Sequence, residues 1–272
     1  MLQGEFFQNP GGATSNFYDY QIEQSLRFDF SSNSYLFKSS LGTPTSLKTG
    51  TWSYWFKLHG NLDDSTSNPE HVHFAAGTSG AAGGYMFFET QNATSGNFMK
   101  LNASNMHNLD AGRSDGRYDD PTAWYHLVIK FDSTQSSASD RLIFYINGEQ
   151  LTGFDTSNVG LNEDLIRWNT NNFIIGAKQP AGHAVDGTDM YFAEWIWVDG
   201  TAYAPTQFGE TKNGVWIPKD PSGTAFGNNG FHLKFEDTSN FGNDSSGNNN
   251  DFDTINGLGA DHQVLDSPTF GG

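Results

Sequence analysis

Glu194 and Asp199 are the carboxylates of the segment AEWIWVDG, residues 193–200, and they are the first side chains that could do chemistry. A retaining glycosidase needs two carboxyl groups about 5 Å apart that face the same substrate. Because side chains alternate between the two faces of an extended strand, an odd spacing puts Glu194 and Asp199 on opposite faces. We therefore expect Glu194 to be a structural strand residue and Asp199 a turn residue before Gly200, and we assign no catalytic residue.

Histidines could bind a transition metal in the segment HVH, where His71 and His73 share one face of a predicted strand. Such a site needs a third ligand from elsewhere, and the sequence identifies none. The chain has no cysteine, which excludes thiolate metal sites, disulfides and a cysteine nucleophile. We interpret His71 and His73 as half-exposed strand histidines.

Calcium is the metal that the acidic loops favour, because it prefers carboxylate and carbonyl oxygens. The best clusters are Asp119 and Asp120 in RYDDPT, and Asp186 and Asp189 in VDGTD. In so acidic a chain, solvated turn carboxylates are the alternative interpretation. No cofactor is required by the sequence, and calcium is the one ion it suggests.

A sugar site combines an aromatic ring with amide and carboxylate groups. Trp168, with Asn169 beside it in IRWNTNN, and Tyr118 in GRYDD lie in polar loops where such a site could form. Trp168 either faces a ligand or packs a loop. Five other tryptophans lie inside predicted strands and are expected in the core: Trp52, Trp55, Trp124, Trp195 and Trp197.

The overall composition limits the possible partners. Asp and Glu number 31 against 14 Lys and Arg, giving a formal net charge of -17 that repels phosphate backbones. We therefore expect no nucleic-acid partner. No apolar run approaches the roughly 18 residues of a membrane helix, and no basic segment leads into an apolar one. The sequence predicts a soluble chain without membrane insertion or a secretory address of its own.

The elements that must position these residues are short strands, because apolar residues alternate and helical spacing is almost absent. Asn147-Gly148 predicts a tight hairpin turn. Many short antiparallel strands predict an all-β, two-sheet sandwich spanning 23–236, with an N-terminal arm at 1–22 and an Asn/Gly/Ser-rich segment at 237–272. The predicted strands are 25–30, 34–38, 51–58, 71–76, 84–90, 97–101, 124–132, 141–151, 172–177, 190–200 and 230–236.

A resemblance appears at WYHLVIKFDSTQSSASDRLIFYINGEQL, residues 124–151, which is similar to the laminin G-like, concanavalin A-like lectin and glucanase module. Later segments resemble the versions carried by virion structural proteins of marine tailed phages: YFAEWIWVDGTAYAPTQFGE, GVWIPKDPSG, NNGFHLKFEDTSNFGNDSSGNNNDF and DHQVLDSPT. The resemblance covers roughly residues 17–269 and implies a jelly-roll sandwich. Other branches of the family imply glycan binding, calcium sites or glycoside hydrolysis. The Glu-x-Asp-x-x-Glu pattern of its glucanases is absent here.

The segment NFGNDSSGNNNDFD, residues 240–253, should not order by itself, since it carries only Phe241 and Phe252 as large apolar side chains. The resemblance continues through it, which favours docking of both phenylalanines on the chain's own sandwich. We expect residues 1–16 and 260–272 to make few contacts within the chain and to depend on neighbouring subunits.

The resemblance implies a non-enzymatic structural protein of a phage virion, in capsid decoration, the tail or a fibre. Its expected partners are other virion proteins and further copies of the chain, with a host cell-surface glycan as a possible ligand. The alternative is a glycan-binding adhesin, and a glycoside hydrolase is the third hypothesis. Fold alone does not decide between them.

Overall fold

A computed structural model describes most of the chain, and its regular elements there are β-strands and four short 3-10 helices. The helices are η1 (Phe30–Ser32), η2 (Ala138–Asp140), η3 (Pro205–Gln207) and η4 (Ala260–His262). In the described part, no helix is long and apolar enough to cross a membrane. The described residues are 17–32, 34–59, 70–77, 86–92, 99–102, 114–118, 120–165, 169, 172–177 and 187–269.

The larger sheet has eight strands, all paired antiparallel, in the order β16-β1-β11-β3-β7-β8-β9, with β14 on the same edge of β11 as β1. Asn147 and Gly148 have φ values of 49° and 83° and form the predicted turn between β8 and β9. The strands are β1 (Ser25–Phe28), β3 (Thr49–Leu58), β7 (Tyr125–Asp132), β8 (Leu142–Ile146), β9 (Glu149–Gln150), β11 (Met190–Asp199), β14 (Phe231–Leu233) and β16 (Gln263–Val264).

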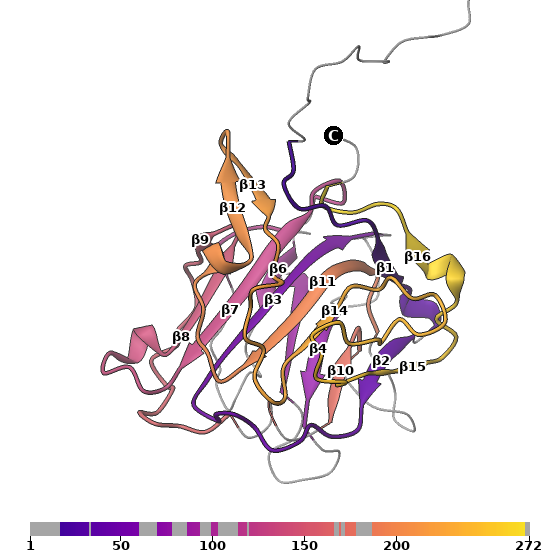
Figure 1. The fold of residues 1–272 in the computed structure, drawn as a ribbon. Coiled ribbons are helices and arrows are strands. Elements are labelled where there is room, and N and C mark those ends of the chain that lie inside the picture. Colours follow the sequence, from indigo (N-terminus) through magenta and orange to yellow (C-terminus); the bar gives the residue numbers. More distant parts are fainter. Residues whose placement is uncertain are drawn as a thin grey trace, which may run out of the picture.

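The second sheet has six strands in the order β15-β2-β10-β4-β5-β6, and a separate hairpin projects from the body (Figure 1). The strands of this six-stranded sheet are β2 (Tyr35–Lys38), β4 (Glu70–Ala76), β5 (Met86–Asn92), β6 (Met99–Asn102), β10 (Phe173–Ile175) and β15 (Asp253–Ile255). The separate hairpin consists of β12 (Gly209–Lys212) and β13 (Val215–Pro218). The predicted all-β, two-sheet jelly roll is confirmed. Each predicted strand has a counterpart, whereas β12, β13, β15 and β16 were not predicted.

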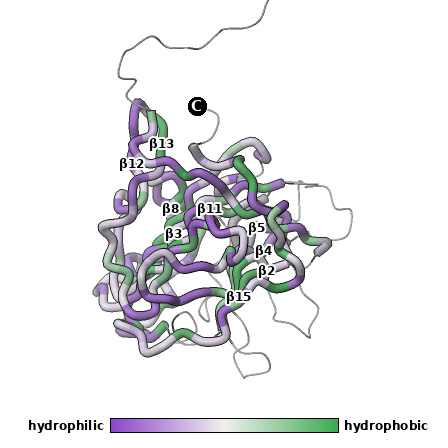
Figure 2. The backbone as a smooth tube through the Cα atoms, turned by 45° about the vertical axis from the view of Figure 1, so that its right-hand side comes forward, coloured by the Kyte–Doolittle hydropathy of each residue, from purple (hydrophilic) through white to green (hydrophobic). Residues whose placement is uncertain are grey.

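The core is aromatic and lies between the two sheets. Trp52 of β3 stacks on Trp197 of β11 at 4.2 Å between ring centroids, and on Phe173 of β10 at 4.8 Å. Trp195 and Tyr54 stack at 3.8 Å in the same core. Such pairs add about 0.5–1.5 kcal/mol each beyond the area they bury. Hydrophobic stretches accordingly gather in the central strands, while the outer loops are hydrophilic (Figure 2).

A β-bulge interrupts β11, where its register against β3 shifts between Ala193 and Ile196. Glu194 has a φ of 49°, a left-handed conformation that is costly for a side chain with a Cβ atom. The extra residue places Ala193 and Glu194 on the outer face before alternation resumes with Trp195 in the core. The bulge therefore aims the Glu194 carboxylate away from the sandwich interior.

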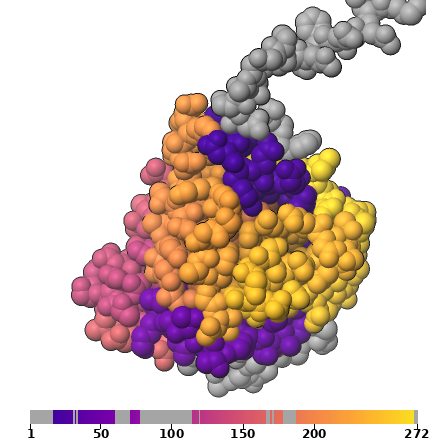
Figure 3. Space-filling model, viewed as in Figure 1, coloured from indigo at the N-terminus to yellow at the C-terminus, as the bar shows by residue number. Residues whose placement is uncertain are grey.

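The Asn-rich C-terminal segment docks on the sandwich (Figure 3). Phe241 and Phe252 are 1% and 2% exposed and belong to the main core, so their predicted burial is confirmed. Phe252 packs edge-on against Phe231 of β14, with 4.7 Å between ring centroids. Its backbone N–H donates to the carbonyl of Gly242 at 2.9 Å.

Residues 260–269 differ from the expectation that they make few contacts within the chain. Gln263–Val264 pairs with β1 as strand β16. The hydroxyls of Ser267 and Thr269 donate to the carbonyl of Ile22 at 2.5 and 3.0 Å, and both residues are buried. The expectation was wrong because hydroxyl and backbone hydrogen bonds, rather than apolar burial, attach this segment. Residues 1–16 and 270–272 lie outside the described residues.

Candidate functional site

A cleft of about 170 Å³ opens on the outer face of the larger sheet, beside β14. Four regions far apart in the sequence build it: the end of the N-terminal arm, the loop after β13, β14 with the residue that follows it, and the docked C-terminal segment. We call it the β14 cleft. Its lining residues are Tyr20, Asp220, Pro221, Ser222, Phe226, His232, Lys234, Ser245 and Ser246.

Two residues that line the β14 cleft, Tyr20 and His232, are joined through the Glu194 carboxylate, which is not itself a lining residue. His232 Nε2 donates to Glu194 Oε2 at 2.5 Å, and the Tyr20 hydroxyl donates to Glu194 Oε1 at 2.9 Å. Both carboxylate oxygens are therefore engaged. Burial and the nearby Glu194 carboxylate raise the pKa of Tyr20 well above its ordinary value, which keeps the hydroxyl protonated. The bulge in β11 is what brings Glu194 to this face.

One wall of the cleft is held in place by Asp244, which is 8% exposed. Its Oδ1 accepts hydrogen bonds from the backbone N–H groups of His232 and Ser246, both at 2.9 Å. Its Oδ2 accepts from the Ser246 hydroxyl at 2.8 Å and from the Asn250 N–H at 2.9 Å. A single carboxylate thus ties β14 to the C-terminal segment and fixes the serines at the cleft.

The mouth of the cleft combines apolar ring faces with polar groups. Phe226 is half-buried and stacks on His232, with 5.9 Å between centroids and 21° between planes. Asp220, Ser222 and Ser245 are exposed around it. Aromatic faces next to a few hydrogen-bonding groups are the usual lining of a small-molecule site. The cleft thus offers both apolar contact and hydrogen-bonding groups at one place.

Glu194 and Asp199 do not share a site, as predicted from their spacing. Asp199 is 1% exposed and accepts from the backbone N–H groups of Thr45 at 2.6 Å and Asn229 at 3.0 Å. It also accepts from Asn169 Nδ2 at 2.7 Å. Asp199 therefore fastens loops at the end of β11, while Glu194 faces the outer surface.

Ser53 and His126 form a buried pair that the sequence did not predict. Their Oγ and Nε2 atoms are 2.8 Å apart. The indole N–H of Trp216 donates to His126 Nδ1 at 3.0 Å, so Nε2 must carry the proton and donate to Ser53. A general base needs the opposite tautomer, with a lone pair toward the serine. This pair is therefore structural.

Two of the three residues predicted for sugar binding are described, and both lie away from the β14 cleft. Tyr118 is 7% exposed and packs edge-on against Tyr125, with 5.4 Å between centroids. Asn169 is fully buried and donates to the Ser46 carbonyl at 2.8 Å as well as to Asp199. Neither lines the β14 cleft. Trp168 lies outside the described residues.

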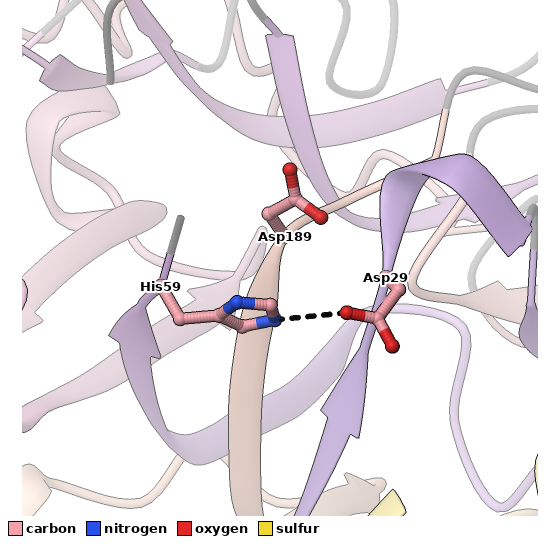
Figure 4. Close-up of side chains that lie close together, drawn as sticks. All are labelled: Asp29, His59 and Asp189. Carbon is pink, nitrogen blue, oxygen red and sulfur yellow. Dashed lines mark ion pairs between the residues drawn. The ribbon is translucent and has the colours of Figure 1, made fainter. Parts of the chain in front are cut away.

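The residues predicted for calcium are only partly described, since Asp119 and Asp186 lie outside the described residues. Asp120 is exposed, and its Oδ1 accepts hydrogen bonds from the backbone N–H and the hydroxyl of Thr122 at 2.8 and 2.7 Å. These bonds are those of a solvated turn. Asp189 lies instead with Asp29 and His59 (Figure 4).

His71 and His73 are buried rather than half-exposed, with exposed fractions of 4% and 0%. Their interpretation as half-exposed residues was wrong because both lie against the packed interior. His71 Nδ1 accepts from the Asp189 N–H at 3.2 Å, and His73 Nδ1 lies 2.9 Å from the Tyr54 hydroxyl. Burial lowers the pKa of His71 to about 4.

The lining of the β14 cleft was missed because it joins distant segments. One local signal was available. In GFHLKFE, residues 230–236, alternation puts His232 and Lys234 on the face opposite Phe231 and Leu233. This pattern indicates a polar outer face on β14, although nothing local indicates which residues lie across from it.

Comparisons with known proteins support the fold. No protein-family model and no curated protein sequence matches the chain. Among solved structures, a candidate carbohydrate-binding protein from Bacteroides ovatus is similar at 17% identity with a TM-score of 0.53, over 92% of this chain and 62% of that one. The shared fold is an all-β jelly-roll sandwich of two antiparallel sheets.

Two further structures are more distant. A heptameric SAP-like pentraxin from Limulus polyphemus is 15% identical with a TM-score of 0.44, over 69% of this chain and 81% of that one. The carbohydrate-binding module CBM40 of the Ruminococcus gnavus IT-sialidase, bound to α2,3-sialyllactose, is 13% identical with a TM-score of 0.30, over 57% of this chain and 84% of that one.

Proposed function

We propose that the chain is a non-enzymatic, carbohydrate-binding module of a phage virion, and that the β14 cleft holds the sugar. The observation that carries the sugar-binding part is the cleft itself. It presents the half-buried rings of Tyr20 and Phe226 beside exposed hydroxyls, a carboxylate and an ammonium group. A sugar offers apolar C–H faces and many hydroxyls, which match these two kinds of group.

The size and rigidity of the cleft agree with this ligand class. Its volume of about 170 Å³ is below the range of roughly 300–1,000 Å³ typical of drug-sized ligands, and suits a single sugar ring. Glu194 holds the lining residues Tyr20 and His232, and Asp244 holds one wall, so little ordering is needed on binding. The Bacteroides ovatus protein is described as a candidate carbohydrate-binding protein, which agrees with the proposal at the level of fold only.

The carboxyl groups at the described lining of the cleft support the non-enzymatic part of the proposal, because they do not form a free pair. Glu194 has both oxygens engaged by His232 and Tyr20. Asp220 Oδ1 accepts from the Ser222 N–H at 2.9 Å within a loop turn. Two carboxyl groups free to face one glycosidic bond are what hydrolysis would require.

The virion assignment rests on the sequence resemblance. The segments at 191–210, 214–223, 228–252 and 261–269 carry that resemblance. In this proposal the module is exposed on the capsid, tail or fibre, contacts other virion proteins and further copies of itself, and meets glycans of the host surface. Mass spectrometry of purified particles tests it, and absence of the chain from them contradicts it.

A glycan array probed with the full chain tests sugar binding, followed by calorimetry with the sugar that binds best. Phe226→Ala removes one ring face, and Ser245→Arg fills the mouth without touching the core. We expect each to weaken binding at least tenfold, whereas Leu265→Ala, a change at a residue 65% exposed, leaves it unchanged. Unaltered melting temperatures show that the variants fold. An array without any binding, or full binding by both cleft variants, refutes the assignment of the cleft.

A further inference from the structure

Three neighbouring strands of the larger sheet end in a row of metal-ligand side chains. Phe28 of β1 pairs with Met190 of β11, which pairs in turn with Leu58 of β3. The next step along the same register aligns Asp29, Asp189 and His59. The backbone bond from His59 N–H to the Asp189 carbonyl, at 3.1 Å, shows that the register continues. Because Phe28, Met190 and Leu58 face the core, this row faces outward.

The three side chains lie close enough to share one ion. One donor atom from each lies within 4.8 Å of the others (Figure 4). All three residues are half-buried, which leaves room for water ligands. Each comes from the end of a paired strand rather than from a free loop, so their relative positions are fixed by the sheet.

Hydrogen bonds already engage part of the row. His59 Nε2 donates to the Phe28 carbonyl at 2.8 Å and also faces Asp29 Oδ1 at 3.7 Å (Figure 4), so an ion held by this nitrogen would displace its proton and its bond to the carbonyl. Asp189 Oδ1 accepts from the Phe30 N–H at 2.7 Å. Metal-binding carboxylates are commonly hydrogen-bonded by neighbouring groups in this way.

We infer that Asp29, His59 and Asp189 form a binding site for a divalent transition-metal ion of the zinc class. The imidazole nitrogen distinguishes it from a calcium site, because calcium takes six to eight oxygen ligands. Two carboxylates and one imidazole suit zinc, with water completing the coordination. Asp189, one of the residues expected to hold calcium, would bind this ion together with two residues that the sequence did not single out.

Neighbouring groups define the surroundings of this site. His262 Nε2 lies 3.6 Å and Arg27 Nε 3.4 Å from Asp29 Oδ2, whereas Asp29 Oδ1 faces His59 Nε2 at 3.7 Å and is the oxygen that an ion would take. His71, which contacts the Asp189 backbone, has a buried Nε2 without a hydrogen-bond partner.

Calorimetry with zinc on the metal-stripped full chain tests the inference. We expect one zinc per chain, with affinity reduced at least tenfold in Asp189→Asn and in His59→Gln. His59→Gln keeps an N–H for the Phe28 carbonyl and loses the ring nitrogen that a metal ion would take. Asp253→Asn, a change at an exposed carboxylate of β15, is the matched control and should bind zinc normally.

Cobalt(II) absorption gives a second readout, because its visible bands report nitrogen and oxygen coordination directly. Zinc affinity unchanged in both site variants overturns the inference. Calcium binding that both variants abolish, without zinc binding, overturns the class of metal. Melting temperatures of the stripped proteins separate lost coordination from lost folding.

Discussion

Asp244→Asn is the perturbation that best tests how the C-terminal segment is held. The carboxylate accepts four hydrogen bonds, whereas an asparagine has one acceptor oxygen and turns an NH2 group toward two of the former donors. The Ser246 hydroxyl can rotate and accept, but the Asn250 N–H cannot. A buried donor left unpaired costs about 1–3 kcal/mol, and the remaining bonds become weaker neutral ones. We therefore expect a loss of about 3 kcal/mol.

Urea unfolding measures this change, and Asp253→Asn in the same segment is the control. Asp253 is exposed and should change stability by less than about 0.5 kcal/mol. Hydrogen exchange locates the effect: the amides of Ser245 and Phe252, which donate to His232 and Gly242, should exchange faster in Asp244→Asn. Equal stability of the two variants would refute the view that Asp244 anchors the segment to β14.

Two further predictions concern acid stability and close packing. Burial lowers the pKa of His126 from 6.5 to about 3. Between these two pH values the unfolded chain binds a proton at this residue and the folded chain does not, so the free energy of unfolding falls as pH drops from 6.5 toward 3. Urea unfolding should show about 2 kcal/mol less stability from this residue at pH 5 than at pH 7, and a smaller pH dependence in His126→Gln. Gly242→Ala would place a Cβ atom 1.9 Å from the Phe252 carbonyl oxygen and should lower the melting temperature by several degrees. Gly223→Ala, whose Cβ atom would have nothing within 4 Å, is the control and should leave it unchanged. Equal melting temperatures of the two variants would contradict the docked geometry.

The strands of the sandwich could be predicted because each carries its own alternating pattern. β3 and β11 show it in TWSYWFKL and MYFAEWIWVDG. The hairpin of β12 and β13 had an overlooked signal, Asn213-Gly214, whose φ values of 53° and 81° match those of a tight turn. β15 and β16 have no such signal, because two or three residues are too short to show a period.

The bulge in β11 could not be predicted from the local sequence. The spacing of Glu194 and Asp199 correctly predicts opposite faces, but the sequence does not show that Glu194 has a left-handed conformation or that it meets His232 and Tyr20. Both contacts join residues at least 38 positions apart. The β14 cleft depends on these long-range contacts, so its lining could not be predicted from any single segment.

The composition that predicts disorder in residues 240–253 is also what docking there requires. Phe241 and Phe252 bury the two ends of the segment in the core. Between them, the side-chain amides of Asn248 and Asn250 both donate to the Gly230 carbonyl at 2.9 Å. An apolar segment in this place would leave such carbonyls unpaired, at a cost of about 1–3 kcal/mol for each buried group. Short polar side chains between two phenylalanines therefore satisfy the backbone of the β14 edge and leave Ser245 exposed at the cleft.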